Sequence, residues 1–123
     1  MRLVLAVVDD LIFQSKLREA AQRAGTRLVC ATTSPPPDAV PAEEPWDLVI
    51  LDLGLTWTDP LAVLEAVRRR APQARIIGYC PHVDVALQAK AYAAGCSEVI
   101  PRSALARRLP DLLGETPERR QSP

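Results

Sequence analysis

The sequence lacks the features that mark several common classes of protein. Lys and Arg together number 15, as do Asp and Glu, so the formal net charge is zero. Nothing in that balance indicates a nucleic acid or a membrane surface as a partner. No apolar run is long enough to span a bilayer. The apolar opening, Leu3–Val8, is short for a signal peptide and ends in Asp9 and Asp10. We therefore expect a cytoplasmic protein.

Motifs built on cysteine, histidine or glycine are equally scarce. The three cysteines, Cys30, Cys80 and Cys96, show no C-x-x-C spacing, so neither a disulfide framework nor a zinc site is expected. The single histidine, His82, follows a proline and is a poor candidate for a catalytic base. No G-x-G-x-x-G or G-K-[ST] phosphate loop occurs. The sequence therefore predicts no catalytic residues, and the protein is not expected to be an enzyme.

Short, continuous apolar runs are the strongest structural signal that is present. At 123 residues, with 48% hydrophobic residues, the chain is long enough for one domain with one core. The runs Leu3–Val8 and Leu48–Leu53 lack alternation, as expected of strands buried on both faces of a parallel sheet. Three weaker stretches complete the set of predicted strands: 27–32, 74–80 and 97–100.

Helical patterns separate most of these strands. Helices are predicted at 11–24, ended by Gly25, at 60–70, capped by Asp59, at 83–94 and at 104–109, capped by Ser103. Pro110 is expected to kink the last helix or to start a new turn. The segment 34–45 contains five prolines, so a degraded helix of at most one turn is expected there.

Alternating strands and helices predict an α/β fold with a doubly wound, five-stranded parallel sheet. Right-handed crossovers and one switch point give the flavodoxin-like strand order 2-1-3-4-5. We expect one domain over residues 1–113, followed by a flexible tail over 114–123.

This strand order brings together acidic residues that lie far apart in the sequence. Asp9 and Asp10 follow the first strand and Asp52 ends the third, so the three form a predicted acid pocket. Mutual repulsion there raises a pKa or requires a cation, and oxygen ligands favour Mg²⁺. Arg102 and Cys80, at the ends of two further strands, are expected beside the pocket. The alternative is local: Asp9 and Asp10 cap the first helix, and Asp52 caps a turn.

The order and spacing of these pieces resemble a known family. The matching segments are Val7–Asp10, Asp47–Leu53, Arg75–Cys80 and Ala93–Arg102. Together they resemble the receiver domain of two-component response regulators, over Leu3 to about Leu113. The resemblance implies the receiver fold and a role in signal transduction.

By that resemblance, specific roles fall on the aspartates. Asp52 is the candidate phosphoacceptor. Asp10, Asp52 and the backbone carbonyl of Gly54 would hold Mg²⁺, with Asp9 acting through water.

Four positions depart from the family pattern. Cys80 stands where the family has Thr or Ser, and a thiol is a weaker hydrogen-bond donor. Arg102 replaces a nearly constant Lys, and its planar fork is not equivalent to an ammonium. Val99 stands at the position of a mobile aromatic residue, and Thr56 at that of a proline.

Two functions remain open. The favoured one is a stand-alone, atypical receiver that acts as a protein-interaction module, with impaired or absent switching; without metal, Arg102 would bond Asp52 directly. The alternative is a working phosphoacceptor, labelled on Asp52 by a histidine kinase in a Mg²⁺-dependent reaction. A hydrolase of the haloacid-dehalogenase type would need a second Asp where Gly54 stands, and is disfavoured.

The partner is expected to be a histidine kinase or a downstream signalling protein, with no nucleic acid or membrane involved. The family's usual docking face corresponds to the helix at 83–94, the strand at 97–100 and the helix at 104–109, and could also support a homodimer. Its residues would include Leu87, Lys90, Ala91, Tyr92, Val99, Ala104, Arg107 and Arg108.

Overall fold

A computed structural model describes residues 3–31, 46–56, 58–82 and 84–114 of the chain. Its strands are β1 (Leu3–Val7), β2 (Arg27–Ala31), β3 (Leu48–Asp52), β4 (Arg75–Cys80) and β5 (Glu98–Pro101). All pairings are parallel and the strand order is β2-β1-β3-β4-β5, which confirms the predicted topology. β1 and β3 are buried at every position, as their unbroken apolar runs predict.

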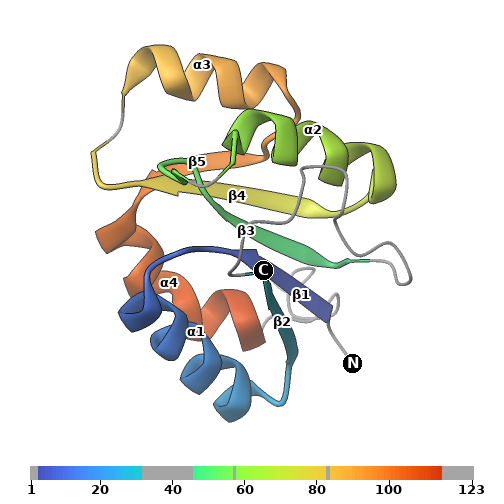
Figure 1. Ribbon diagram of the computed structural model, residues 1–123. Coiled ribbons are helices and arrows are strands. Elements are labelled where there is room, and N and C mark those ends of the chain that lie inside the picture. Colours follow the sequence, from blue (N-terminus) through green and yellow to red (C-terminus); the bar gives the residue numbers. More distant parts are fainter. Residues whose placement is uncertain (1–2, 32–45, 57, 83, 115–123) are drawn as a thin grey trace, which may run out of the picture.

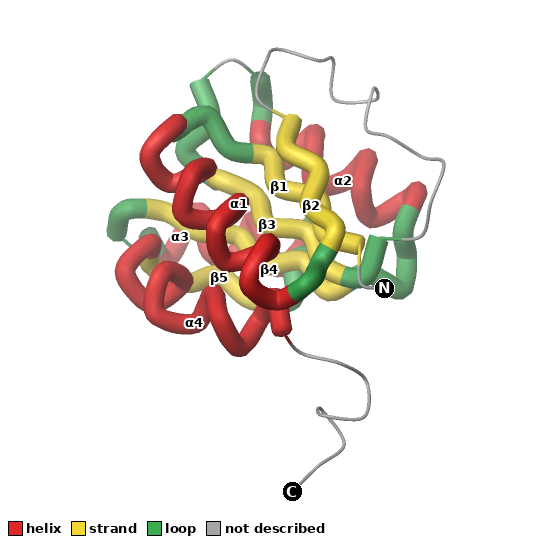
Figure 2. Tube along the Cα trace, turned by 90° about the horizontal axis from the view of Figure 1, so that it is seen from below, coloured by secondary structure: helices red, strands yellow, loops and turns green. Residues whose placement is uncertain are grey.

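Four helices of the described chain cover the sheet: α1 (Leu11–Ala24), α2 (Pro60–Arg70), α3 (Val85–Ala93) and α4 (Arg102–Gly114). α1 and α4 lie on one face, and α2 and α3 lie on the other (Figures 1 and 2). Each face has its own hydrophobic cluster. Phe13 and Leu17 of α1 pack with Leu105 of α4, whereas Leu64 and Val67 of α2 belong to the opposite cluster. The sheet is therefore doubly wound, as predicted.

Polar side chains fix where three of the helices begin. Asp10, Asp59 and Asp84 are the N-caps of α1, α2 and α3, and each accepts a backbone N–H of the first turn. Gly25 ends α1 in a left-handed conformation, with φ +67°. The capping predictions for Asp59 and Gly25 are thus confirmed.

The last helix differs from its prediction at both ends. α4 begins at Arg102, directly after β5, so Ser103 is its second residue and not its cap. It also continues through Pro110 to Gly114, which the sequence places in the tail. Pro110 costs about 3 kcal/mol inside a helix. Ending the helix there would expose the buried Leu112 and Leu113, and burying two leucines is worth roughly 3–6 kcal/mol.

The other predictions have mixed outcomes. α3 runs over Val85–Ala93, shorter than the predicted 83–94. The degraded helix within 34–45 and the tail beyond residue 114 lie outside the described residues, and the predicted domain limits remain a prediction. None of the helices described has the length and apolarity needed to cross a lipid bilayer. All three cysteines are free, as predicted.

One arginine ties together the loops at the amino ends of β4 and β5. Arg68 of α2 donates from Nε and Nη2 to the carbonyl of Gly95, at 3.1 and 2.6 Å. Its Nη1 donates to the carbonyls of Pro72 and Ala74, each at 2.9 Å. Gly95 has φ +113°, and a Cβ there would approach the Arg68 side chain to 3.0 Å. The close contact between these two loops therefore requires a glycine.

A second polar cluster joins β4, β5 and α4. Glu98 accepts from Arg75 Nη2 at 2.7 Å and from Arg108 Nη1 at 2.7 Å. The hydrogen bond from Arg108, followed by that from Arg75, lowers the pKa of Glu98 to about 2. The pairing links the edge of the sheet to the helix that packs on it.

Candidate functional site

Asp52 ends β3 at the carboxyl edge of the sheet and is one of two polar residues buried in the described chain, with 4% of its surface exposed. Its Oδ1 accepts the backbone N–H of Gly54 at 2.8 Å. Burial raises the pKa of Asp52 above its ordinary value. The Gly54 amide opposes that rise, while the charge of Asp9 and a hydrogen bond to its carboxyl add to it. Asp9 and Asp52 are therefore neighbours, as predicted.

Asp10 completes the acid pocket and is engaged through both oxygens. Oδ1 accepts from the amides of Ile12, at 2.9 Å, and Phe13, at 3.3 Å. Oδ2 lies 3.4 Å from Nη1 of Arg102. The predicted capping role of Asp10 is therefore confirmed, and the same carboxylate also contacts Arg102. Asp52 likewise combines a turn-type bond to Gly54 with its place in the pocket.

Arg102 reaches the pocket from the start of α4, as its position after the last strand predicts. It pairs with Asp10, whereas the sequence predicts a direct bond to Asp52. Its charge nevertheless lowers the pKa of Asp52, as the least of the causes that act on this carboxyl. The guanidinium carbon lies 6.0 Å from the ring centroid of Phe13 and 6.0 Å from that of Tyr79. Two aromatic rings therefore hold the cation beside the acids.

Sequence analysis misses the role of these two aromatic residues at the site. Tyr79 is fully buried, pairs with Asp52 in the register of β3 and β4, and packs on Phe13 at 5.0 Å between ring centroids. Burial, and then the charge of Asp52, raise the pKa of the Tyr79 phenol. Its hydroxyl and the Nε of Arg102 are buried, with no hydrogen-bond partner in the part of the chain described. The signal available in the sequence is the position of Tyr79, one residue before the strand end.

The remaining altered positions are spread around the site. Cys80 ends β4 and is buried, and burial raises the pKa of its thiol. Val99 is buried in β5, and its N–H donates to the Tyr92 hydroxyl at 3.2 Å. Thr56 is exposed beyond the end of β3. The charge of Asp52 adds to the rise in the pKa of the Cys80 thiol.

The donor set of the pocket is suited to a hard divalent cation, because it consists of carboxylate oxygens. Asp10, Asp52 and the carbonyl of Gly54 would hold the ion. In the described residues, no group of three or more His, Cys, Asp or Glu side chains is spaced to bind a metal. A metal at Oδ2 of Asp10 would compete with Arg102 for that oxygen, whereas Asp52 accepts from Gly54 through Oδ1 alone.

Two residues of the predicted docking face do not lie at the surface. Ala91 and Val99 are buried and cannot contact a partner, because they pack in the cluster beneath α3. Tyr92 is 46% exposed, and Lys90 and Arg107 are also exposed. Leu87, Ala104 and Arg108 are half-buried.

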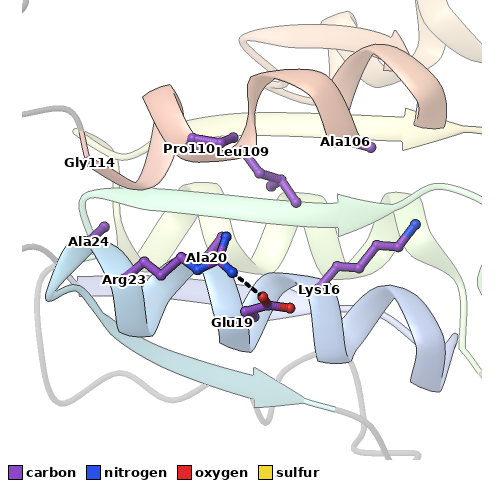
Figure 3. A pocket seen from close by; sticks show the side chains of 9 residues that line it. All are labelled: Lys16, Glu19, Ala20, Arg23, Ala24, Ala106, Leu109, Pro110 and Gly114. Carbon is purple, nitrogen blue, oxygen red and sulfur yellow. Dashed lines mark hydrogen bonds and ion pairs between the residues drawn. The ribbon is translucent and has the colours of Figure 1, made fainter.

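A separate groove of about 600 Å³ lies between α1 and α4 (Figure 3). Its lining is apolar at the base, with an ion pair between Arg23 and Glu19 at 2.6 Å on one side. The lining residues are Lys16, Glu19, Ala20, Arg23, Ala24, Ala106, Leu109, Pro110 and Gly114. None of the acid-pocket residues contributes to it, so it is a feature distinct from the predicted site.

Comparison with known proteins finds similarity in structure only. No model of a known protein family matches the sequence, and no curated protein matches it. A response regulator from Burkholderia pseudomallei, solved with a phosphorylated aspartic acid, a calcium ion and citrate, superposes with a TM-score of 0.76 at 19% identity. That match covers 100% of this chain and 76% of the other.

Two further structures give the same result. A CheY-like receiver domain from Methanospirillum hungatei has a TM-score of 0.77 at 18% identity, covering 92% of this chain and 94% of the other. The chemotaxis protein CheY4 from Vibrio cholerae has a TM-score of 0.79 at 19% identity, covering 92% and 96%. The chain therefore has the fold of response-regulator receiver domains, as the motif resemblance predicts.

Proposed function

We propose that this chain is an atypical receiver domain, a cytoplasmic protein-interaction module of signal transduction in which phosphorylation-dependent switching is impaired or absent. The observation that carries the proposal is the ion pair between Arg102 and Asp10, which engages one of the two acidic side chains that a metal would need. A histidine kinase or a downstream signalling protein is the partner, and neither nucleic acid nor membrane is involved. The module has no enzymatic activity of its own toward a separate substrate.

The surroundings of Asp52 support impaired phosphorylation. A carboxylate must be ionised to attack phosphorus, and both burial and the neighbouring Asp9 favour its protonated form. Cys80 supplies a thiol where a hydroxyl would bond a phosphoryl group, and a thiol is the weaker donor. Each feature works against formation or readout of a phosphorylated state.

The alternative is a working phosphoacceptor, favoured by Asp9, Asp10 and Asp52, whose charges all act on the buried phenol of Tyr79. With acetyl phosphate, an oxygen of Asp52 would attack phosphorus, and acetate would leave with the electrons of the broken P–O bond. A bound magnesium ion would supply positive charge against the phosphoryl oxygens.

Intact-protein mass spectrometry after incubation with acetyl phosphate, with and without Mg²⁺, separates the two functions. We expect no mass gain in wild type under conditions that fully label an ordinary receiver domain run in parallel. Asp52→Asn is the matched control. A Mg²⁺-dependent gain of one phosphoryl group that is absent from Asp52→Asn would overturn the proposal in favour of the phosphoacceptor.

The exposed part of α3 and α4 is the proposed contact surface, and it also supports a homodimer. Sedimentation equilibrium of wild type and of a Tyr92→Ala/Arg107→Glu variant tests this. If copies associate through this surface, we expect the variant to weaken association at least tenfold, whereas Arg18→Glu, on α1, leaves it unchanged. Equal association of all three proteins would place the contact elsewhere.

A further inference from the structure

The guanidinium of Arg102 lies within the acid pocket and pairs with Asp10. Its side chain begins at the first residue of α4, immediately after β5, so its origin is set by the sheet. The rings of Phe13 and Tyr79 pack on each other and both face it, each with its centroid 6.0 Å from the guanidinium carbon. Because both rings belong to buried residues, the cation is held beside the carboxylates by the core itself.

Asp10 has no oxygen left without a donor. Oδ1 caps α1 through the amides of Ile12 and Phe13, and Oδ2 pairs with Arg102. A divalent cation that used Asp10 would have to take Oδ2, because removing Oδ1 would uncap the helix. The metal and the guanidinium therefore require the same atom. Two cations that share one carboxylate oxygen also repel each other at short range.

A second hydrogen-bond acceptor is available to Arg102. Its Nε and the Tyr79 hydroxyl are both buried without a hydrogen-bond partner among the residues described. The guanidinium carbon already lies 6.0 Å from the centroid of the Tyr79 ring, which stands opposite Asp52 in the register of β3 and β4. A guanidinium that left Asp10 could therefore donate to the Tyr79 hydroxyl oxygen. Unsatisfied buried groups of this kind are costly, so an alternative arrangement that pairs them is favourable.

We infer that Arg102 is a built-in competitor of divalent cations: its guanidinium occupies Oδ2 of Asp10, and a metal that uses this oxygen enters the acid pocket only when Arg102 leaves it and turns toward the Tyr79 hydroxyl. The inference concerns the same pocket as the proposed function but does not rest on it, since competition for Asp10 takes place whether or not Asp52 is ever phosphorylated.

Binding of Mn²⁺ to the full chain, followed by the electron paramagnetic resonance signal of the free ion, tests the inference directly. Arg102→Gln should bind Mn²⁺ about tenfold more tightly than wild type or better, because one competing positive charge is gone. Mg²⁺ should displace the Mn²⁺ from the variant. The matched control is Arg18→Gln, which removes the same charge from an exposed position of α1 and should bind as wild type does.

A double variant identifies the ligand. In Arg102→Gln/Asp10→Asn, the amide oxygen of Asn can still cap α1, but the anionic oxygen is lost. The gain in Mn²⁺ affinity should therefore disappear. The inference is overturned if Arg102→Gln binds no more tightly than Arg18→Gln, including the case in which neither binds, or if the double variant keeps the gain.

A second measurement uses the wild-type protein, so its outcome does not depend on whether the Arg102 variant folds. In protein labelled with ¹³C and ¹⁵N, titration with Mg²⁺ should shift the Nε–H resonance of Arg102 with the same saturation curve as the carboxyl carbon of Asp10. A saturating Asp10 signal with an unmoved Arg102 resonance would overturn the inference. The proposed function fails on a different readout, the mass gain with acetyl phosphate, so the two failures are distinguishable.

Discussion

The two ends of the sheet use the same residue type in opposite ways. At the amino ends of β4 and β5, Arg68 donates from all three guanidinium nitrogens to the backbone carbonyls of Gly95, Pro72 and Ala74. At the carboxyl ends, Arg102 makes one ion pair of 3.4 Å and leaves its buried Nε without a partner in the described chain. Every guanidinium nitrogen of Arg68 therefore donates a hydrogen bond, whereas Arg102 has a buried nitrogen that donates none within the described chain.

The difference separates a structural role from a functional one. Each guanidinium nitrogen of Arg68 already donates to a backbone carbonyl, which suits it to holding two loops together. Arg102 lies among three carboxylates and a phenol, with fewer bonds than it can make. Proteins satisfy their buried polar groups where structure alone is required, and leave them unsatisfied mainly where a ligand or a change of partner is involved.

Replacing each arginine by alanine should give the largest difference in the free energy of unfolding between the two roles. Arg68→Ala leaves several half-buried carbonyls without a donor and should lower the free energy of unfolding by about 3 kcal/mol in urea titrations. Arg102→Ala should lower it by less than about 1 kcal/mol, as expected of a partly exposed ion pair. Arg69→Ala, at an exposed position of α2, is the control and should change little. Equal costs for Arg68 and Arg102 would remove the contrast.

Neutralising the buried acid should have the next largest effect, and with the opposite sign. Asp52→Asn keeps an oxygen for the Gly54 amide and removes the charge beside Asp9, so it should raise the free energy of unfolding by roughly 1–2 kcal/mol at pH 8. The folded pKa of Asp52 is raised, so its carboxyl stabilises the fold below the ordinary value of 3.8, and this is lost as pH rises through the folded pKa.

The gain from Asp52→Asn should therefore disappear when the urea titration is repeated near pH 3.8. Asp111→Asn, at an exposed position of α4, serves as control and should show no such trend. Destabilisation by Asp52→Asn at pH 8 would contradict this prediction. It would mean that favourable pairing of the ionised Asp52 carboxylate outweighs its burial and its repulsion by Asp9.

Replacing Glu98, which belongs to a structural polar cluster, should have the smallest effect on the free energy of unfolding. Its folded pKa is lowered from 4.5 to about 2, so its stabilisation is present above 4.5 and is lost as pH falls through about 2. Glu98→Gln should cost about 0.5 kcal/mol at pH 7, since the pairs with Arg75 and Arg108 are partly exposed. The cost should vanish at pH 2. A Glu65→Gln control, exposed on α2, should show no pH-dependent difference from wild type.

Much of the fold could be predicted from the sequence because its signals are local. The runs at β1 and β3 indicate buried strands, and Asp59 followed by Pro60 marks the start of α2. The handedness of the crossovers then fixes the strand order. The course of α4 could not be predicted in this way, because Pro110 is a local signal that the burial of Leu112 and Leu113 outweighs.

The sequence predicts that the three aspartates lie at one edge of the sheet, but it does not predict which of them pairs with Arg102. Topology alone brings Asp9, Asp10 and Asp52 to one edge. The guanidinium of Arg102, which pairs with Asp10, lies against the packed rings of Phe13 and Tyr79. That packing involves side chains from α1, β4 and α4, and no pattern within any one segment reports it.

The double use of Asp10 has a consequence for the surface around the pocket. Fraying of the first turn of α1 is opposed by the same carboxylate that pairs with Arg102, so the charge state of the pocket sets how often that turn opens. Leu11 and Ile12, 71% and 74% exposed, are carried on this turn. The rates of amide hydrogen exchange at Ile12 and Phe13 would therefore change when the ion pairing of Asp10 in the pocket changes. A partner that binds these two apolar side chains would respond to the cation without touching it.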